Sequence, residues 1–243
     1  FLNMFFFEIL IIVFLIIFQS VFGIGLLLFG TPTFLLLGYN FLDVLNLLLP
    51  ISILISFIQF FSSKKKNKEF KRNFNLYCLP FLIISLYIVM KNINKIDLEI
   101  YIALIIILFS VVSINKEKIA YLKKFNSTKQ KIFFSILGII HGLTNLGGSL
   151  LTILSSTINK QDKYKTRYCI SYGYLVMGIF QISGLYIFSN HNIERANLLY
   201  LILVFLIYLP TQKIFRNFKS KRFSNFLNVF ALFYGLIILI KNI

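Results

Sequence analysis

Long apolar stretches alternate with short polar segments along the whole chain. Residues 41–61 contain one charged side chain, and residues 226–240 contain none. An α-helix rises about 1.5 Å per residue, so about 20 apolar residues are enough to cross the hydrocarbon core of a bilayer. Of the 243 residues, 58% are hydrophobic and only 14% are charged, which leaves too little polar surface for a soluble domain of this length. The pattern predicts an all-α polytopic membrane protein.

One apolar run, residues 132–158, is interrupted at its centre. Gly142, Gly147 and Gly148 lie there, and each glycine weakens a helix by about 1 kcal/mol relative to alanine. Thr144 and Asn145 add polar groups that compete for the backbone. We therefore predict a hairpin of two half-helices that enters the membrane and returns on the same side.

The first apolar run, residues 3–38, has a matching interruption at Gly23-Ile24-Gly25. A break at membrane depth leaves backbone N–H and C=O groups unpaired. Such groups are tolerated only where protein or a water-filled cavity satisfies them. A pair of broken helices in corresponding positions is typical of a substrate site.

The two hairpins begin two halves of similar order. A shift of 122 residues places Gly25 on Gly147 and Gln19 on His141, and the apolar blocks then superpose. Charge-rich loops fall on charge-poor loops under this shift, which is the pattern of an inverted repeat. The first repeat is predicted at residues 1–122, with a hairpin at 3–38, spans at 40–62, 74–91 and 99–115, and a cytoplasmic loop. The second is predicted at residues 123–243, with a hairpin at 132–158 and spans at 167–189, 197–212 and 223–241.

Positive charge is concentrated in a few short segments. The net charge is +17, and 21 of the 25 Lys and Arg residues lie within residues 64–72, 116–131, 160–167 and 213–222. Cytoplasmic loops of membrane proteins carry such an excess, so we expect these basic loops in the cytoplasm, against the anionic headgroups of the membrane. The charge therefore indicates the lipid bilayer, and not nucleic acid, as a partner.

No catalytic or metal-binding motif accompanies this pattern. The motifs HExxH, GxSxG and GxxxxGK do not occur, and Cys78 and Cys169 have no CxxC or Cys/His spacing. We therefore expect no enzyme, no cofactor, no metal site and no built-in ATP motor. His141 is the only histidine within a predicted span and is a candidate for proton coupling. A hydrogen bond from His141 to a neighbouring helix is at least as common a role.

The two interrupted runs share small residues at similar places: Gly23-Ile24-Gly25, Pro32 and Gly38 in the first, and Gly142, Gly147, Gly148 and Ser149 in the second. These positions resemble the two Gly-rich signatures of the TauE/SafE family of sulfite exporters. The resemblance covers the whole chain, with Leu26 and Leu27 standing where the family has further glycines. It implies a multi-pass permease of the bacterial plasma (inner) membrane that carries sulfite, another sulfur-containing anion or a small organic anion without ATP.

Backbone groups are the expected ligands, because no Lys or Arg lies at the centre of a predicted span. A helix N-terminus acts as about half a positive charge with free N–H groups, so half-helices that begin near Gly25 and Gly148 suit a monoanion between them. The alternative is that the glycines allow close helix packing. The candidate substrate-binding residues are Gly23, Gly25, Thr31, Gly142, Thr144, Asn145, Gly147, Gly148 and Ser149.

The leading hypothesis is a secondary transporter of a small anion that works by alternating access between inverted halves. A non-transporting membrane assembly or scaffold protein is the main alternative, and a passive anion channel is a third. A homo-oligomer is left open. The remaining expectations are that Asp43 caps a helix N-terminus, and that Gln59, Tyr172 and Gln181 line a cavity.

Overall fold

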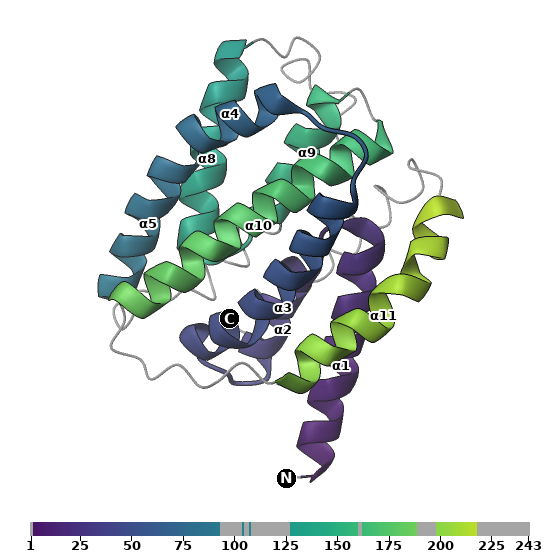
Figure 1. Ribbon diagram of the computed structural model, residues 1–243. Coiled ribbons are helices and arrows are strands. Elements are labelled where there is room, and N and C mark those ends of the chain that lie inside the picture. The colour runs from purple at the N-terminus through teal and green to yellow at the C-terminus, as the bar shows by residue number, and fades with distance from the viewer. Residues whose placement is uncertain are drawn as a thin grey trace.

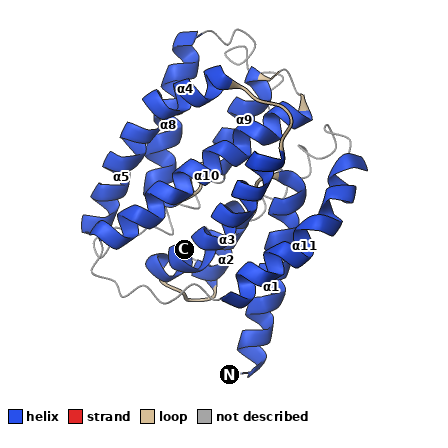
Figure 2. Cartoon of the chain, viewed as in Figure 1, coloured by secondary structure: helices blue, strands red, loops and turns tan. Residues whose placement is uncertain are grey.

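All elements in the described part of the chain are α-helices (Figures 1 and 2). The computed structural model describes residues 2–92, 104, 107, 127–159, 162–188 and 198–217. The helices are α1 (Leu2–Phe22), α2 (Leu26–Leu36), α3 (Phe41–Ser62), α4 (Lys68–Tyr77), α5 (Leu79–Asn92), α8 (Ser127–Thr144), α9 (Gly148–Ile158), α10 (Lys163–Phe188) and α11 (Leu198–Asn217). The predicted spans at 99–115, apart from Leu104 and Ile107, and at 223–241 lie outside the described residues.

Four described segments are long and apolar enough to cross a membrane: Phe41–Ser62, Lys68–Asn92, Lys163–Phe188 and Leu198–Asn217. Large apolar side chains also point outward from these helices, and Ile187, Leu198 and Leu209 are each more than 70% exposed. An apolar outer surface is stable in lipid and unfavourable in water. The prediction of an all-α polytopic membrane protein is confirmed.

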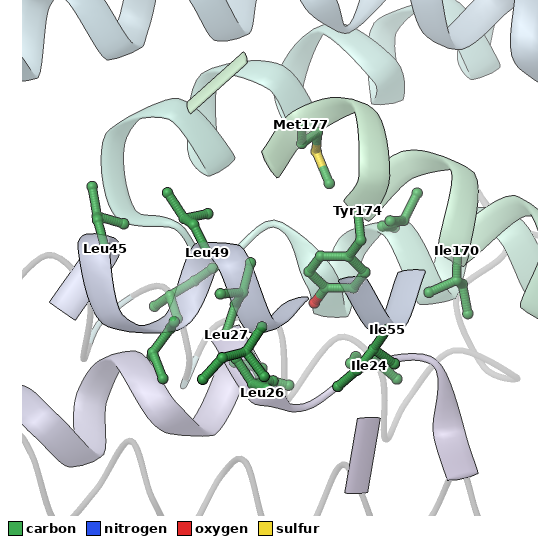
Figure 3. Packing of buried hydrophobic residues seen from close by; sticks show 14 of the residues in the cluster. Ile24, Leu26, Leu27, Leu45, Leu49, Ile55, Ile170, Tyr174 and Met177 are labelled. Carbon is green, nitrogen blue, oxygen red and sulfur yellow. The ribbon is translucent and has the colours of Figure 1, made fainter. Parts of the chain in front are cut away.

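The centre of the molecule is the crossing of α3 and α10, which pack against each other. The contact is close because Gly178 of α10 has no side chain and faces Ile53 of α3. The half-helix α2 packs on α3, and the half-helix α9 packs on α10. On the outside, α1 packs against α11 and α8 packs against α5. A continuous cluster of buried apolar residues joins these helices, part of which Figure 3 shows.

The two hairpins enter the bundle from opposite sides. The start of α8 and the end of α9 lie in the upper part of Figure 1, at the same end of the bundle as α4. The N-terminus of α1 and the loop that follows α2 lie at the lower edge. The two hairpins therefore run in opposite directions in this view.

Two local predictions need correction. Asn40, and not Asp43, caps α3, because the Asn40 side chain accepts a hydrogen bond from the N–H of Asp43. The predicted basic loop at 64–72 is partly helical, since α4 begins at Lys68 behind the cap residue Asn67. This helix forms because Phe70 and two further residues of the segment bury one of its faces while Lys68 and Arg72 remain exposed.

Candidate functional site

The second hairpin is broken at residues 145–147, as predicted. Asn145 adopts a left-handed backbone conformation with φ of 63°, which ends α8. Its N–H donates to the carbonyl of His141 at 2.8 Å, and the N–H of Leu146 donates to the hydroxyl of Thr144 at 3.3 Å. The break is therefore a defined turn whose backbone groups are partly satisfied by its own residues.

His141 holds this turn against α10. Its Nδ1 accepts the N–H of Gly147 at 3.1 Å, and its Nε2 lies 3.0 Å from Oε1 of Gln181. Because a backbone N–H can only donate, Nδ1 carries no proton, and the proton of the neutral ring is on Nε2, where it donates to Gln181. The ring is fully buried. These bonds favour a neutral, structural histidine, and the role of proton carrier stays a prediction.

The first hairpin is broken at Gly23 and Gly25, whose φ angles of 77° and 127° are open to glycine and rare for other residues. A side chain on Gly25 would also overlap the ring of Phe18. The carbonyls at the end of α1 are satisfied from α3: Gln59 donates to the carbonyl oxygen of Gln19 at 2.9 Å and to that of Ser20 at 3.2 Å. The break is thus held by a buried glutamine of the neighbouring helix.

The two breaks are held in the same way. In the first half, the amide of Gln59 donates to the carbonyl of Gln19. In the second half, the amide of Gln181 donates to the carbonyl of His141 at 3.2 Å. The shift of 122 residues places Gln59 on Gln181 and Gln19 on His141. Corresponding residues of the two halves therefore make corresponding hydrogen bonds.

The two half-helices begin without side-chain caps. The residues before them, Gly25 for α2 and Gly147 for α9, make no side-chain hydrogen bond to the first turn. In contrast, α3 and α4 are capped by Asn40 and Asn67. An uncapped helix start presents N–H groups and a positive dipole end, which is the geometry that binds anions.

The second break touches the first hairpin directly. The side-chain amide of Asn145 donates to the hydroxyl of Thr31 in α2 at 3.0 Å, and both residues are fully buried. The half-helices α2 and α9 also contact each other. The two hairpins are therefore in direct contact in the buried interior of the bundle, where the second break packs against the middle of α2.

Unpaired polar atoms gather in this region. Six buried side-chain atoms lack a hydrogen-bond partner within the described ranges, and four of them belong to the two breaks. They are Ser20 Oγ and Gln59 Oε1 near the first break, and Asn145 Oδ1 and Tyr174 Oη near the second. Buried polar atoms are nearly always paired in folded proteins, so such a group marks a place where a polar ligand fits.

The structure brings most of the predicted substrate-binding residues to the breaks. Thr144 and Ser149 border the second break, where Ser149 is half-buried in the first turn of α9. Gly142 lies elsewhere, because a side chain there would overlap Ser85 and the backbone of Leu82 in α5. Its position fits the alternative of close helix packing. The residues at or between the breaks are Gly23, Gly25, Thr31, Asn145, Gly147 and Gly148.

Sequence reasoning missed two features of this region. Tyr174 lies in the middle of α10 with its hydroxyl against Gly148, and a tyrosine in an apolar run gave no signal of that contact. Arg167, in the second turn of α10, reaches the end of α1 and donates to the carbonyl of Ser20 at 3.1 Å and to Gln212 at 2.8 Å. Tyr172, a predicted cavity residue, instead donates to Asn75 of α4 at 2.7 Å.

A comparison with known protein families shows to which family the chain belongs. The profile of the family described as "Sulfite exporter TauE/SafE" matches residues 8–238, nearly the whole chain. The chain belongs to the TauE/SafE family. No curated protein and no solved structure matches it. Membership places this TauE/SafE protein among membrane transporters, and its broken helices provide a physical basis for that function.

Proposed function

We propose that this TauE/SafE protein is a secondary transporter that exports a small anion, either sulfite or another sulfur-containing or organic anion, across the bacterial plasma membrane. The observation that carries the proposal is the pair of uncapped half-helix starts, at Leu26 and Gly148, in two hairpins that touch at the buried bond between Asn145 and Thr31. The motif GxxxxGK does not occur in the sequence, and we propose a gradient as the driving force.

Two helix N-termini give the charge that one anion needs. Each N-terminus acts as about half a positive charge, so α2 and α9 together offer about one unit. Backbone N–H groups suit this task in a membrane, because they present partial positive charge without the desolvation cost of a full charge that lacks a partner. A singly charged oxyanion between Leu26 and Gly148 would accept hydrogen bonds from both first turns.

Alternating access would depend on the opposite orientation of the two halves in the membrane. The matching bonds of Gln59 and Gln181, and the opposite directions of the two hairpins in Figure 1, support an inverted repeat. In such transporters, one half rocks against the other around a site at the centre of the membrane. The contact between Asn145 and Thr31 lies on the boundary between the halves and would have to change during this motion.

Charge on one side of the bundle supports anion capture from the cytoplasm. The basic residues of α4 and the start of α10 lie at the upper edge in Figure 1, and Arg167 extends from there to the first break. A positive surface raises the local concentration of anions and steers them toward the site. This is the arrangement that an exporter with cytoplasmic basic loops needs.

Anion flux into proteoliposomes tests the proposal. The purified full chain is reconstituted, and uptake of radiolabelled sulfite is measured against concentration, with and without an imposed pH gradient. A transporter shows saturable uptake, and protein-free liposomes provide the baseline. Uptake that does not saturate would favour the passive channel. No uptake of sulfite, thiosulfate, sulfate or small carboxylates would favour the scaffold protein.

A further inference from the structure

We propose that the hydroxyl of Tyr174 is a ligand of the transported anion and donates a hydrogen bond to it at the N-terminus of α9. The inference rests on the proposed function, and it adds a side-chain donor to the backbone groups discussed above. It also identifies the residue that makes the second half chemically different from the first.

Tyr174 is an unsatisfied donor in the middle of a membrane-spanning helix. Its side chain is fully buried, and its hydroxyl has no hydrogen-bond partner within the described residues. A buried tyrosine hydroxyl usually finds a partner, because leaving it unpaired costs free energy that a phenylalanine would not cost. A ligand that accepts the hydrogen bond would explain why the hydroxyl is there.

The hydroxyl is aimed at the start of a half-helix. A side-chain carbon on Gly148, the first residue of α9, would overlap the hydroxyl oxygen and the ring carbon that bears it. Glycine at this position therefore makes the room that the hydroxyl occupies. Figure 3 shows the ring extending from α10 toward the part of the cluster that holds Ile24, Leu26 and Leu27, where α2 begins. The hydroxyl thus lies at the N-terminus of α9, on the side that faces the first break.

The surroundings suit an anion as the partner. A neutral hydroxyl beside a helix N-terminus can donate to an oxyanion, and the positive dipole end adds to the attraction. Leu27, Ile55 and Met177, which Figure 3 draws around the ring, are fully buried and apolar, so water does not weaken such a bond. The shift of 122 residues places Ser52 on Tyr174, and Ser52 is already bonded to Gln19. Of these two corresponding hydroxyls, only that of Tyr174 has no hydrogen-bond partner within the described residues.

Replacement of Tyr174 by phenylalanine tests the inference, because Tyr174→Phe removes the hydroxyl and keeps the ring. We expect the KM for sulfite uptake in proteoliposomes to rise about tenfold, the effect of losing one charge-assisted hydrogen bond. Tyr172→Phe is the matched control on the same helix, since its hydroxyl bonds to Asn75 and not to a break. The KM of this control should stay within about twofold of wild type.

Thermal unfolding of the same proteins separates ligand binding from packing. Without sulfite, Tyr174→Phe should be as stable as wild type or more stable, because an unpaired buried hydroxyl is removed. With sulfite, wild type should gain stability and Tyr174→Phe should gain clearly less. A variant that loses stability without sulfite would show that the hydroxyl has a structural role and would overturn the inference.

The outcomes distinguish this inference from the function on which it rests. Saturable uptake by wild type with an unchanged KM in Tyr174→Phe overturns the role of Tyr174 and leaves the transporter intact. Absence of saturable uptake by wild type, for every anion tried, overturns the proposed function and the role of Tyr174 with it.

Discussion

Gln181 makes two hydrogen bonds with His141. Its side-chain oxygen lies 3.0 Å from Nε2 of the ring, and its amide nitrogen donates to the carbonyl oxygen of His141 at 3.2 Å. The other ring nitrogen accepts the N–H of Gly147. One glutamine of α10 thus fixes both the end of α8 and, through the ring, the residue just before α9.

Loss of this glutamine should weaken the fold. Gln181→Leu leaves the Nε2 proton of His141 unpaired in a buried site, at about 1–3 kcal/mol. It also removes one of the two hydrogen bonds that the carbonyl of His141 accepts, while the bond from the N–H of Asn145 remains. We expect a clearly lower temperature of thermal unfolding in detergent. Gln59→Leu should have a smaller effect in the same direction at the first break, because the carbonyls of Gln19 and Ser20 each lose one hydrogen bond and keep another.

Gln130 provides the control for these two variants. It lies on α8, is only half-buried, and makes no bond to either break. Gln130→Leu should leave the unfolding temperature within about 1 °C of wild type, since exposed substitutions away from such networks rarely exceed about 0.5 kcal/mol. Equal unfolding temperatures for all three variants would contradict the holding role of the two buried glutamines.

The role of His141 can be tested by replacing it with glutamine, because Gln19 occupies the corresponding place in the first half. If the ring acts as a neutral clamp, His141→Gln should keep sulfite uptake within a few-fold of wild type, and its response to an imposed pH gradient should not change. A proton carrier cannot be replaced by glutamine, which does not titrate. Downhill uptake that persists in His141→Gln but no longer responds to the gradient would establish proton coupling through His141.

Two glycines of the same signature should respond differently to alanine. Gly142→Ala places a methyl group against the backbone of α5, which cannot move away easily, so we expect a loss of about 1–3 kcal/mol in stability. Gly148→Ala meets only the far end of the Tyr174 side chain, which can shift. It should insert and fold but take up sulfite with a raised KM. Unfolding temperatures and uptake measured on both variants check this contrast, and a Gly148→Ala protein with normal uptake would count against the site.

Much of this arrangement follows from the sequence because glycine breaks and loop charges are local signals. The interruptions at Gly23 and Gly25 and at 145–147 could be predicted, since glycine and polar residues within an apolar run disfavour a continuous helix. The opposite directions of the hairpins were indicated by the charges of the loops. Neither signal depends on which helices are neighbours.

What could not be predicted depends on those neighbours. Gly142 and Gly148 look alike in sequence, yet one faces the backbone of α5 and the other a tyrosine hydroxyl. Gln59 and Gln181 are single polar residues in apolar runs, and their function requires the carbonyls of α1 and α8 to lie beside them. Only the packing of α3 and α10 against the hairpins provides those partners.

Glu8 forms another polar contact between distant segments. This contact predicts that the stability of the fold depends on pH in the alkaline range. Its carboxylate accepts hydrogen bonds from Tyr39 at 2.8 Å and from Tyr200 at 2.6 Å. Burial, followed by the hydrogen bond and the charge of Glu8, raises the pKa of Tyr39 to about 12. Tyr39 lies in the loop between α2 and α3, outside the membrane-spanning helices.

The raised pKa means that the fold favours the protonated phenol of Tyr39. Its contribution to stability is complete below the unfolded value of about 10 and is lost as the pH rises from about 10 to about 12. Glu8→Gln removes the charge and lowers this pKa, so the variant should lose less stability over that range than wild type. Unfolding temperatures between about pH 9 and pH 12 check this, with Tyr39→Phe as the control. Identical pH profiles for wild type and both variants would contradict the contact.

The position of the bound anion tests the central claim most directly. Selenite, an oxyanion with a strong anomalous signal, can replace sulfite in crystals of the full chain. We predict one anomalous peak at hydrogen-bond distance from the first turns of both α2 and α9, beside the hydroxyl of Tyr174. A peak that lies away from both half-helix N-termini, in a protein shown to take up selenite, would contradict the account.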